Sequence, residues 1–286
     1  FQAEDGIRDS VASRGLGDVY KRQIGLCQDL VPSVDRFIVN SQFYANKMGE
    51  MLAIPPERFD IAPLSIDVTP FAIANDAEIQ DATAAHLPQS LAFDRADTDN
   101  SFRLGYMARI APEKGFHQLV DSFIRLASKA EHSDLTLHAS GWLGESNQKY
   151  FQAQQQKLEA ARLTDRFTYH GSPDLNQKVR FLKSLDLFSV PTEYEDPKGL
   201  FVLEALAAGV PVIQPDHGAF GELLGSTGGG VLTKPGCLDG LCAAIEELKQ
   251  DDQRRFDLGI SGQQQVIQRH AVGQAVEQLK AILFDH

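Results

Sequence analysis

From Phe102 onward, short apolar runs alternate with longer segments that carry apolar residues at helical spacing. The apolar runs predict strands at residues 102–107, 135–139, 167–171, 187–190, 212–213 and 231–233. The longer segments predict helices at residues 116–130, 147–162, 177–184, 200–208, 238–250 and 257–284. Strands that alternate regularly with helices are typical of βαβ units. We therefore predict an α/β fold: a doubly wound, Rossmann-like parallel sheet with helices on both faces.

A shorter unit of the same kind precedes it. The pattern predicts a strand at residues 35–40, a helix from the capping residue Ser41 to about Leu52, and a strand at residues 59–62. Residues 72–101 are polar and rich in Ala, Asp and Asn, and we interpret them as an interdomain linker. Their Asp97-Thr98-Asp99 matches a metal-binding DxD only superficially, since no apolar strand flanks it.

Residues 1–23 differ from the rest, because they are charged, contain glycine and lack a clean period. They resemble the translation of a sequencing adapter, and we predict that they are non-native and carry no function. The alternative is an ordinary polar N-terminal segment.

The central stretch, residues 187–222, predicts a strand, an acidic loop, a helix and a second strand. Ligands of parallel sheets bind at the carboxyl ends of the strands, where this loop lies. Gly199 opens the helix, and its free N–H groups and dipole favour an anion such as a phosphate. Asp196 and Glu204 would repel that anion, so they suit sugar hydroxyls better. The alternative is that Glu204 only complements the helix N-terminus and that Asp196 is a solvated loop acid.

A second loop carries two cations at the end of the strand at residues 102–107. Arg109 and Lys114 suit a diphosphate, one as a planar fork and the other as a point charge. On the residues alone, a pair of solvated surface cations is the favoured interpretation, and the resemblance described next reverses that preference.

Together these segments resemble the donor site of the family-4 retaining glycosyltransferases of the GT-B fold, over most of residues 34–280. The signature is an acid, seven residues, a glutamate, an Ala- and Gly-rich helix and a Pro-Val strand. The resemblance implies that Glu204 binds the ribose and that Asp196, or the adjacent Glu195, binds the sugar. It assigns the diphosphate to Arg109, Lys114, Gly199 and Leu200. It assigns the base to the turn Tyr169, His170, Gly171 and Ser172, and it implies no metal.

The resemblance also divides the chain into domains. Residues 24–71 would be the end of the N-terminal acceptor domain, with Leu64-Ser65-Ile66-Asp67 just before the crossover. Residues 102–286 would be the C-terminal nucleotide-sugar-binding domain. The rest of the acceptor domain, with its catalytic-region histidine, would precede residue 24. We therefore expect an N-terminally truncated fragment whose catalytic residues are unknown and which is inactive alone.

Composition narrows the classes of partner. The 286 residues are 43% hydrophobic with a net charge of −12, so we expect no nucleic-acid partner. No run of about 18 apolar residues predicts a membrane span. Three cysteines without close pairs fit a reduced, cytoplasmic compartment. The sequence also lacks a GxxxxGK[ST] loop, an HExxH helix and a GxSxG elbow.

The resemblance implies a hexosyltransferase that needs no cofactor and uses a UDP-, GDP- or ADP-sugar. Its acceptor would be a sugar, a lipid or a small molecule, and peripheral association with the membrane stays open. Two alternatives stay open: a nucleotide-sugar-binding module without turnover, and a flavodoxin-like regulatory domain.

Overall fold

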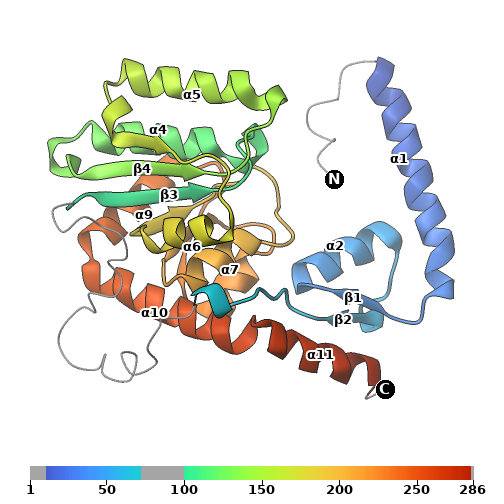
Figure 1. Cartoon of the computed structure of the whole chain (residues 1–286). Helices are drawn as coiled ribbons and strands as arrows, with labels where there is room; N and C mark the ends of the chain where they lie inside the picture. Colours follow the sequence, from blue (N-terminus) through green and yellow to red (C-terminus); the bar gives the residue numbers. More distant parts are fainter. Residues whose placement is uncertain (1–10, 72–99, 285–286) are drawn as a thin grey trace.

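The larger part of the chain folds around a six-stranded parallel sheet with strand order β5-β4-β3-β6-β7-β8 (Figure 1). The computed structural model describes residues 11–71 and 100–284, with side chains from residue 21 onward. The strands are β3 (Phe102–Met107), β4 (Leu135–Ser140), β5 (Phe167–Tyr169), β6 (Leu187–Ser189), β7 (Val212–Pro215) and β8 (Gly230–Thr233). All six strands lie where the apolar runs predicted them.

Helices cover both faces of this sheet, which confirms the predicted doubly wound α/β fold. On one face α4 packs against α5 and α9, and on the other α7 packs against α6 and α10, which also contacts α8. The bounds are α4 (Phe116–Ala127), α5 (Gln148–Ala160), α6 (Leu175–Lys183), α7 (Leu200–Ala207), α8 (Phe220–Thr227), α9 (Leu238–Gln250) and α10 (Asp252–Arg269).

The strand order reverses between β3 and β6. From β3 the chain builds outward to β4 and β5, crosses back to β6, and continues to β7 and β8. The loops after β3 and β6 therefore leave neighbouring strands toward opposite faces, and such a switch point opens a crevice for ligands.

The same two loops are also tied together. The Glu193 N–H donates to the Glu113 carbonyl oxygen at 3.0 Å. Gly115 has φ of +71°, and a Cβ there would lie 1.7 Å from the Pro191 carbonyl oxygen. Only glycine permits this contact, so the relative position of the two loops is fixed.

The core of the sheet domain follows the predicted helical spacing. Phe116, Leu119, Val120 and Phe123 form the inner face of α4 and are fully buried. The ring of Phe116 packs 5.0 Å from that of Tyr106 on β3, centroid to centroid. This packing gives the loop between β3 and α4 a rigid base on both sides.

A smaller βαβ unit lies beside the sheet domain, as the sequence predicted. It contains β1 (Phe37–Val39), α2 (Gln42–Leu52) and β2 (Phe59–Ile61), and its two strands are parallel. The Ser41 hydroxyl accepts a hydrogen bond from the Tyr44 N–H at 3.1 Å, which confirms the predicted helix cap.

The first helix, α1 (Val11–Leu30), was not expected. It runs through much of the segment for which no regular structure was predicted and contacts α2. Leu26 and Leu30 are each 64% exposed, so its C-terminal end buries little apolar surface. The segment lacks the apolar stripe on which helix prediction depends. The adapter origin of residues 1–23 stays a prediction.

The closing helix predicted at residues 257–284 is wrong in two respects. It begins earlier, at Asp252, and it is two helices, α10 and α11 (Val272–Phe284), separated at His270 and Ala271. The Ile66 N–H donates to the His270 carbonyl oxygen at 2.8 Å, and Ile66 pairs with Ala271 in a parallel bridge. The helix therefore breaks where the chain crosses between the two domains.

Two further sequence-based expectations bear on the fold. Most of the predicted linker, residues 72–99, lies outside the described residues, and Asp97-Thr98-Asp99 lies there with it. Among the helices that the structure describes, none has the length and apolar character that crossing a bilayer requires.

Candidate functional site

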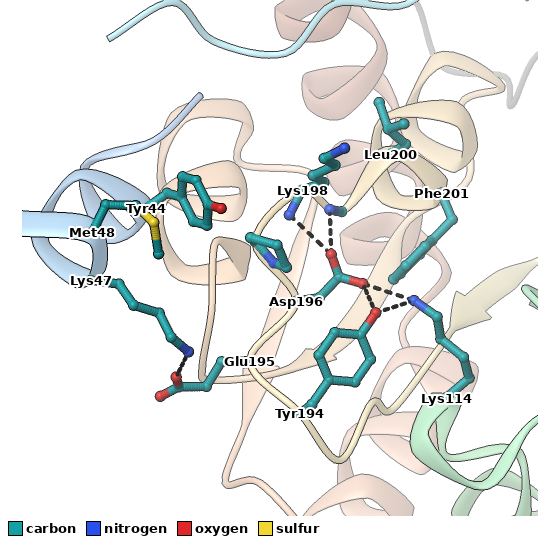
Figure 2. Close-up of a pocket in the computed structure, with 12 residues that line it drawn as sticks. Tyr44, Lys47, Met48, Lys114, Tyr194, Glu195, Asp196, Lys198, Leu200 and Phe201 are labelled. Atoms are coloured by element: carbon teal, nitrogen blue, oxygen red, sulfur yellow. Dashed lines mark hydrogen bonds and ion pairs between the residues drawn. The ribbon is translucent and has the colours of Figure 1, made fainter. Parts of the chain in front are cut away.

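A cavity of about 470 Å³ lies between α2 and the sheet domain. Figure 2 shows Tyr44, Lys47 and Met48 of α2 on one side. The opposite side consists of Lys114, from the loop after β3, and residues 194–201, from the loop after β6 and the start of α7. The cavity thus opens at the switch point of the sheet, as expected for a parallel α/β fold.

Lys114 and Asp196 form a buried ion pair in this cavity. The Lys114 Nζ lies 2.9 Å from the Asp196 Oδ2, and the two side chains are only 12% and 6% exposed. The two residues come from the loops after β3 and β6, so the strand order brings them together. An ion pair with little solvent interacts far more strongly than one at the surface.

Asp196 also organises the start of α7. Its Oδ1 accepts hydrogen bonds from the N–H groups of Lys198 and Gly199 at 2.9 and 3.0 Å. Burial opposes ionisation of this carboxyl group, but the charge of Lys114 and the hydrogen bonds from Lys114, Tyr194 and the Lys198 N–H outweigh it and lower its pKa below the ordinary value. The carboxylate is therefore charged at neutral pH and holds the acidic loop against the helix.

The first turn of α7 still offers donors to a ligand. Leu200 and Phe201 are its first two residues, and their N–H groups precede any intrahelical acceptor. Gly199 has φ of +66°, a conformation that glycine adopts at little cost. The predicted anion site at Gly199 and Leu200 thus lines the cavity together with Lys114.

Arg109 does not line this cavity. It follows β3, as predicted, but its side chain is 51% exposed and its Nη2 lies 3.3 Å from the Glu113 Oε1. Of the donor-site residues that the resemblance implies, Lys114 and Gly199 line this cavity, whereas Arg109 and Glu204 do not. Side-chain direction on an exposed loop is not readable from spacing.

The two other predicted acids are each paired with a lysine. The Glu195 carboxylate lies 2.7 Å from the Lys47 Nζ of α2, so this pair spans the cavity (Figure 2). Glu204, on α7, lies outside the lining residues and is bonded at 2.7 Å to the Lys178 Nζ of α6. Of the two candidate first acids, Asp196 is the buried one and Glu195 the exposed one.

The predicted base turn lies at the end of β5, away from these residues. The Tyr169 hydroxyl donates to the Gly141 carbonyl oxygen at 2.6 Å, and the Gly171 carbonyl oxygen accepts from the Gly141 N–H. The His170 and His138 rings stack, with centroids 5.4 Å apart. Ser172 is exposed. None of the four residues lines the 470 Å³ cavity.

Sequence reasoning missed several residues that line the cavity. Tyr44, Lys47 and Met48 share one face of α2 at a spacing of three and four, but only the tertiary structure brings that face to the cavity. Tyr194 and Phe201 lie within residues 187–222, which the sequence analysis singled out. The sequence does not distinguish an aromatic residue that lines a cavity from one that is buried in the core.

Comparisons with known proteins agree with this fold. The family model described as "Glycosyl transferases group 1" matches residues 91–265. A glycogen synthase of Mycobacterium tuberculosis is 32% identical over 146 residues, which are 51% of this chain and 33% of the relative. A D-inositol 3-phosphate glycosyltransferase of Paenarthrobacter aurescens is 25% identical over 232 residues, or 81% of this chain and 53% of the relative.

Solved structures show the same architecture. Anabaena Alr3699/HepE in complex with UDP and glucose superposes with a TM-score of 0.74 at 21% identity, over 92% of this chain and 67% of that one. Sucrose-phosphate synthase from Thermosynechococcus elongatus gives 0.73 at 20% identity, over 93% and 62%. At this identity the likeness shows the GT-B fold alone.

The chain spans between a third and just over half of the length of these two curated relatives. The family model, by contrast, covers more than half of the chain, including the cavity-lining loops after β3 and β6. This chain belongs to the group 1 glycosyl transferases.

Proposed function

We propose that this chain binds a nucleotide sugar at the cavity between α2 and the sheet domain. In the complete protein it would transfer the sugar, with retention, to an acceptor hydroxyl. The donor would be a UDP-, GDP- or ADP-sugar, and the acceptor a sugar, a lipid or a small molecule. A cytoplasmic location, peripheral at the membrane for a lipid acceptor, belongs to the same proposal.

One observation carries this proposal: the buried Lys114–Asp196 pair lies beside the first turn of α7, and all of these groups line one cavity. A cation next to free helix N–H groups favours a diphosphate. A carboxylate in the same place suits the hydroxyl groups of an attached sugar, one of which would displace a protein donor, because Asp196 already accepts hydrogen bonds at both oxygens. The two preferences together match the two halves of a nucleotide sugar.

These groups also suggest how transfer is promoted. When the bond between the sugar C1 and the diphosphate oxygen breaks, negative charge grows on the departing diphosphate. Lys114 and the N–H groups of Leu200 and Phe201 are held where they would stabilise that charge, which is electrostatic catalysis by preorganised donors. The acceptor oxygen then forms the new bond to C1, and its proton passes to an oxygen of the departing diphosphate.

Two residues compete for the sugar. Asp196 is buried and lines the cavity, whereas Glu195 is 54% exposed in its ion pair with Lys47. We assign the sugar contact to Asp196 and expect Glu195→Gln to leave affinity for the intact nucleotide sugar unchanged. Asp196→Asn should weaken the nucleotide sugar more than the free diphosphate.

A calorimetric titration with UDP, GDP and ADP tests the proposal. Binding of at least one diphosphate, weakened at least tenfold by Lys114→Met, would support it. Absence of binding to all three would refute it.

A second measurement separates transfer from binding alone. Release of the diphosphate from a panel of nucleotide sugars, followed over time, reports turnover or hydrolysis. Release would show that this chain turns over by itself, whereas binding without any release fits both the expected inactive fragment and a binding module, the alternative that this geometry supports equally. The same measurement on the complete protein separates the two. The flavodoxin-like alternative is set aside by the family match over residues 91–265.

A further inference from the structure

Tyr194 connects the two charged groups of the cavity. It lies in the loop after β6, where its hydroxyl donates to the Asp196 Oδ2 at 2.7 Å. The Tyr194 hydroxyl oxygen also accepts a hydrogen bond from the Lys114 Nζ. Figure 2 shows the phenol hydroxyl next to both side chains, which also contact each other directly. The family signature described above includes no residue at this position.

The loop holds Tyr194 in place. Its carbonyl oxygen accepts a hydrogen bond from the Thr192 hydroxyl at 3.1 Å, and Thr192 is buried. Burial, together with the hydrogen bond to Asp196 and its negative charge, raises the pKa of the phenol well above its ordinary value. The hydroxyl therefore stays protonated and donates a hydrogen bond to Asp196 over the whole physiological pH range.

The donors of Lys114 can be counted. An ammonium group has three N–H donors, and Asp196 and Tyr194 accept two of them. The third remains for a ligand in the cavity that Lys114 lines. Two aromatic rings surround the cation, with centroids 4.8 Å away in Tyr194 and 5.3 Å away in Phe201.

The hydroxyl decides where that third donor points. Without it, Lys114 would be held by Asp196 alone, and the ammonium could turn about this single contact. With it, two acceptors at different positions fix the rotation of the ammonium group. A fixed donor binds an anion at a smaller entropy cost than a rotating one.

We propose that Tyr194 is a positioning residue that directs the free N–H of Lys114 toward the diphosphate of a bound nucleotide. This inference rests on the proposed function, because it needs a nucleotide in the cavity. It adds a residue that touches the phosphate only through Lys114.

The variant Tyr194→Phe tests this role, because it keeps the ring and removes only the hydroxyl. The probes are whichever of UDP, GDP or ADP the unmodified chain binds, and the matching nucleoside, which lacks phosphates. We expect the Kd for the diphosphate to rise about tenfold, the effect of losing one hydrogen bond to a charged group. The Kd for the nucleoside, measured by NMR titration, should stay within about twofold.

A double-mutant cycle adds a second readout. In a Lys114→Met background, Tyr194→Phe should change the diphosphate Kd less than twofold, since its only route to the phosphate is gone. If Lys114→Met abolishes measurable binding, the nucleoside comparison alone decides. Tyr150→Phe is the matched control: it removes a half-buried hydroxyl that bonds to His117 outside the cavity, and it should leave both affinities unchanged.

The failures are distinguishable. If the unmodified chain binds none of the three diphosphates, the proposed function fails and this inference fails with it. If it binds one, but Tyr194→Phe leaves the affinity unchanged or weakens diphosphate and nucleoside equally, only the role of Tyr194 is wrong. Thermal unfolding of Tyr194→Phe near the temperature of the unmodified chain establishes that the variant is folded.

Discussion

At the scale of single residues, the Lys114–Asp196 pair does two things at once. It presents a cation to the cavity, and it keeps a buried carboxylate compensated. Removing one member of a buried pair is more harmful than removing both, because it leaves an uncompensated charge. The pair therefore couples the stability of the sheet domain to the chemistry of the cavity.

We predict that Lys114→Met lowers the free energy of unfolding by about 3 kcal/mol. This value is the low end of the range of about 3–5 kcal/mol for breaking a buried ion pair, because Tyr194, Lys198 and Gly199 still donate hydrogen bonds to Asp196. The double variant Lys114→Met/Asp196→Asn should recover most of the loss. Urea denaturation measures both. A single variant that is as stable as the unmodified chain would show that water compensates the carboxylate.

A second prediction concerns Glu204, which is expected to bind a ribose. Glu204→Gln should make the binding free energy of a ribonucleotide less favourable by about 1–3 kcal/mol, the range for losing a charge-assisted hydrogen bond. A nucleotide without the ribose hydroxyls should lose little, because its contact is already absent. Calorimetry with both nucleotides measures the difference.

The control for this experiment is Lys178→Met, which removes the ion-pair partner of Glu204 but keeps the carboxylate. Equal losses for the ribo- and deoxyribonucleotide in Glu204→Gln would contradict the ribose assignment. Glu204 would then serve only to join α7 to α6.

The sequence located some site residues and not others for a physical reason. Lys114, Asp196 and Gly199 lie next to strand ends and a helix start, which local patterns reveal. Lys47 depends on how α2 packs against the loop of Glu195, which lies 148 residues further along the chain. Arg109 was placed on the correct loop, but its pairing with Glu113 is a choice between side-chain conformations.

At the scale of elements, α2 is capped from the other domain. The Glu222 carboxylate, on α8, accepts hydrogen bonds from the N–H groups of Gln42 and Phe43 at the start of α2. The Asn40 side chain donates to the Pro197 carbonyl oxygen at 3.0 Å nearby. A carboxylate at a helix N-terminus is stabilised by the exposed N–H groups and the helix dipole. This cap holds one wall of the cavity against the sheet domain.

We predict that Glu222→Ala lowers the free energy of local opening of α2 by about 1–2 kcal/mol. Amide hydrogen exchange of residues 42–52 should become faster, while exchange in β3 and β4 stays unchanged. Ser41→Ala is the matched control: it removes a cap of α2 that lies within the same domain. Both variants should loosen the helix, but only Glu222→Ala should also increase exposure of the cavity wall to proteolysis. Equal proteolysis in the two variants would contradict a role for Glu222 between the domains.

The break between α10 and α11 shows the limit of pattern reading for elements. Residues 268–271 contain no proline or glycine, and helical periodicity continues through them. The helix ends because Ile66 supplies a tertiary partner for His270 and Ala271. The start of α10 was also missed, although the sequence carries a capping residue there: the Asp251 side chain accepts from the Arg254 N–H at 2.9 Å.

At the scale of the whole molecule, His270 joins the two domains. Its ring is buried, and its Nδ1 lies 2.7 Å from the Leu64 carbonyl oxygen. Burial lowers the pKa of His270 below its ordinary value of 6.5, and the positive charge of Arg269 acts in the same direction, against the hydrogen bond to Leu64. The folded chain therefore takes up this proton at lower pH than the unfolded chain does.

The sign of the resulting pH dependence follows. Below about pH 6.5 the unfolded state binds more protons at this site, so the free energy of unfolding decreases as pH falls toward the lowered pKa. The loss amounts to about 1.4 kcal/mol for each unit by which the pKa is lowered. His270→Gln removes the titrating group and keeps a donor for Leu64. Denaturation between pH 7.5 and about 5 should show a flatter dependence in this variant; an unchanged slope would place the titration elsewhere.

The bridge between Ile66 and Ala271 has a mechanical consequence. Two stretches of chain, one leaving the small βαβ unit and one returning toward it, run side by side at a single point. A single connecting segment would allow one domain to rotate in any direction relative to the other. Two segments that are hydrogen-bonded together resist twisting and bend most easily about one axis. The cavity wall formed by α2 is therefore expected to move relative to the sheet domain about a single axis. Lys47 would then return to the same position beside Glu195 each time the cavity closes.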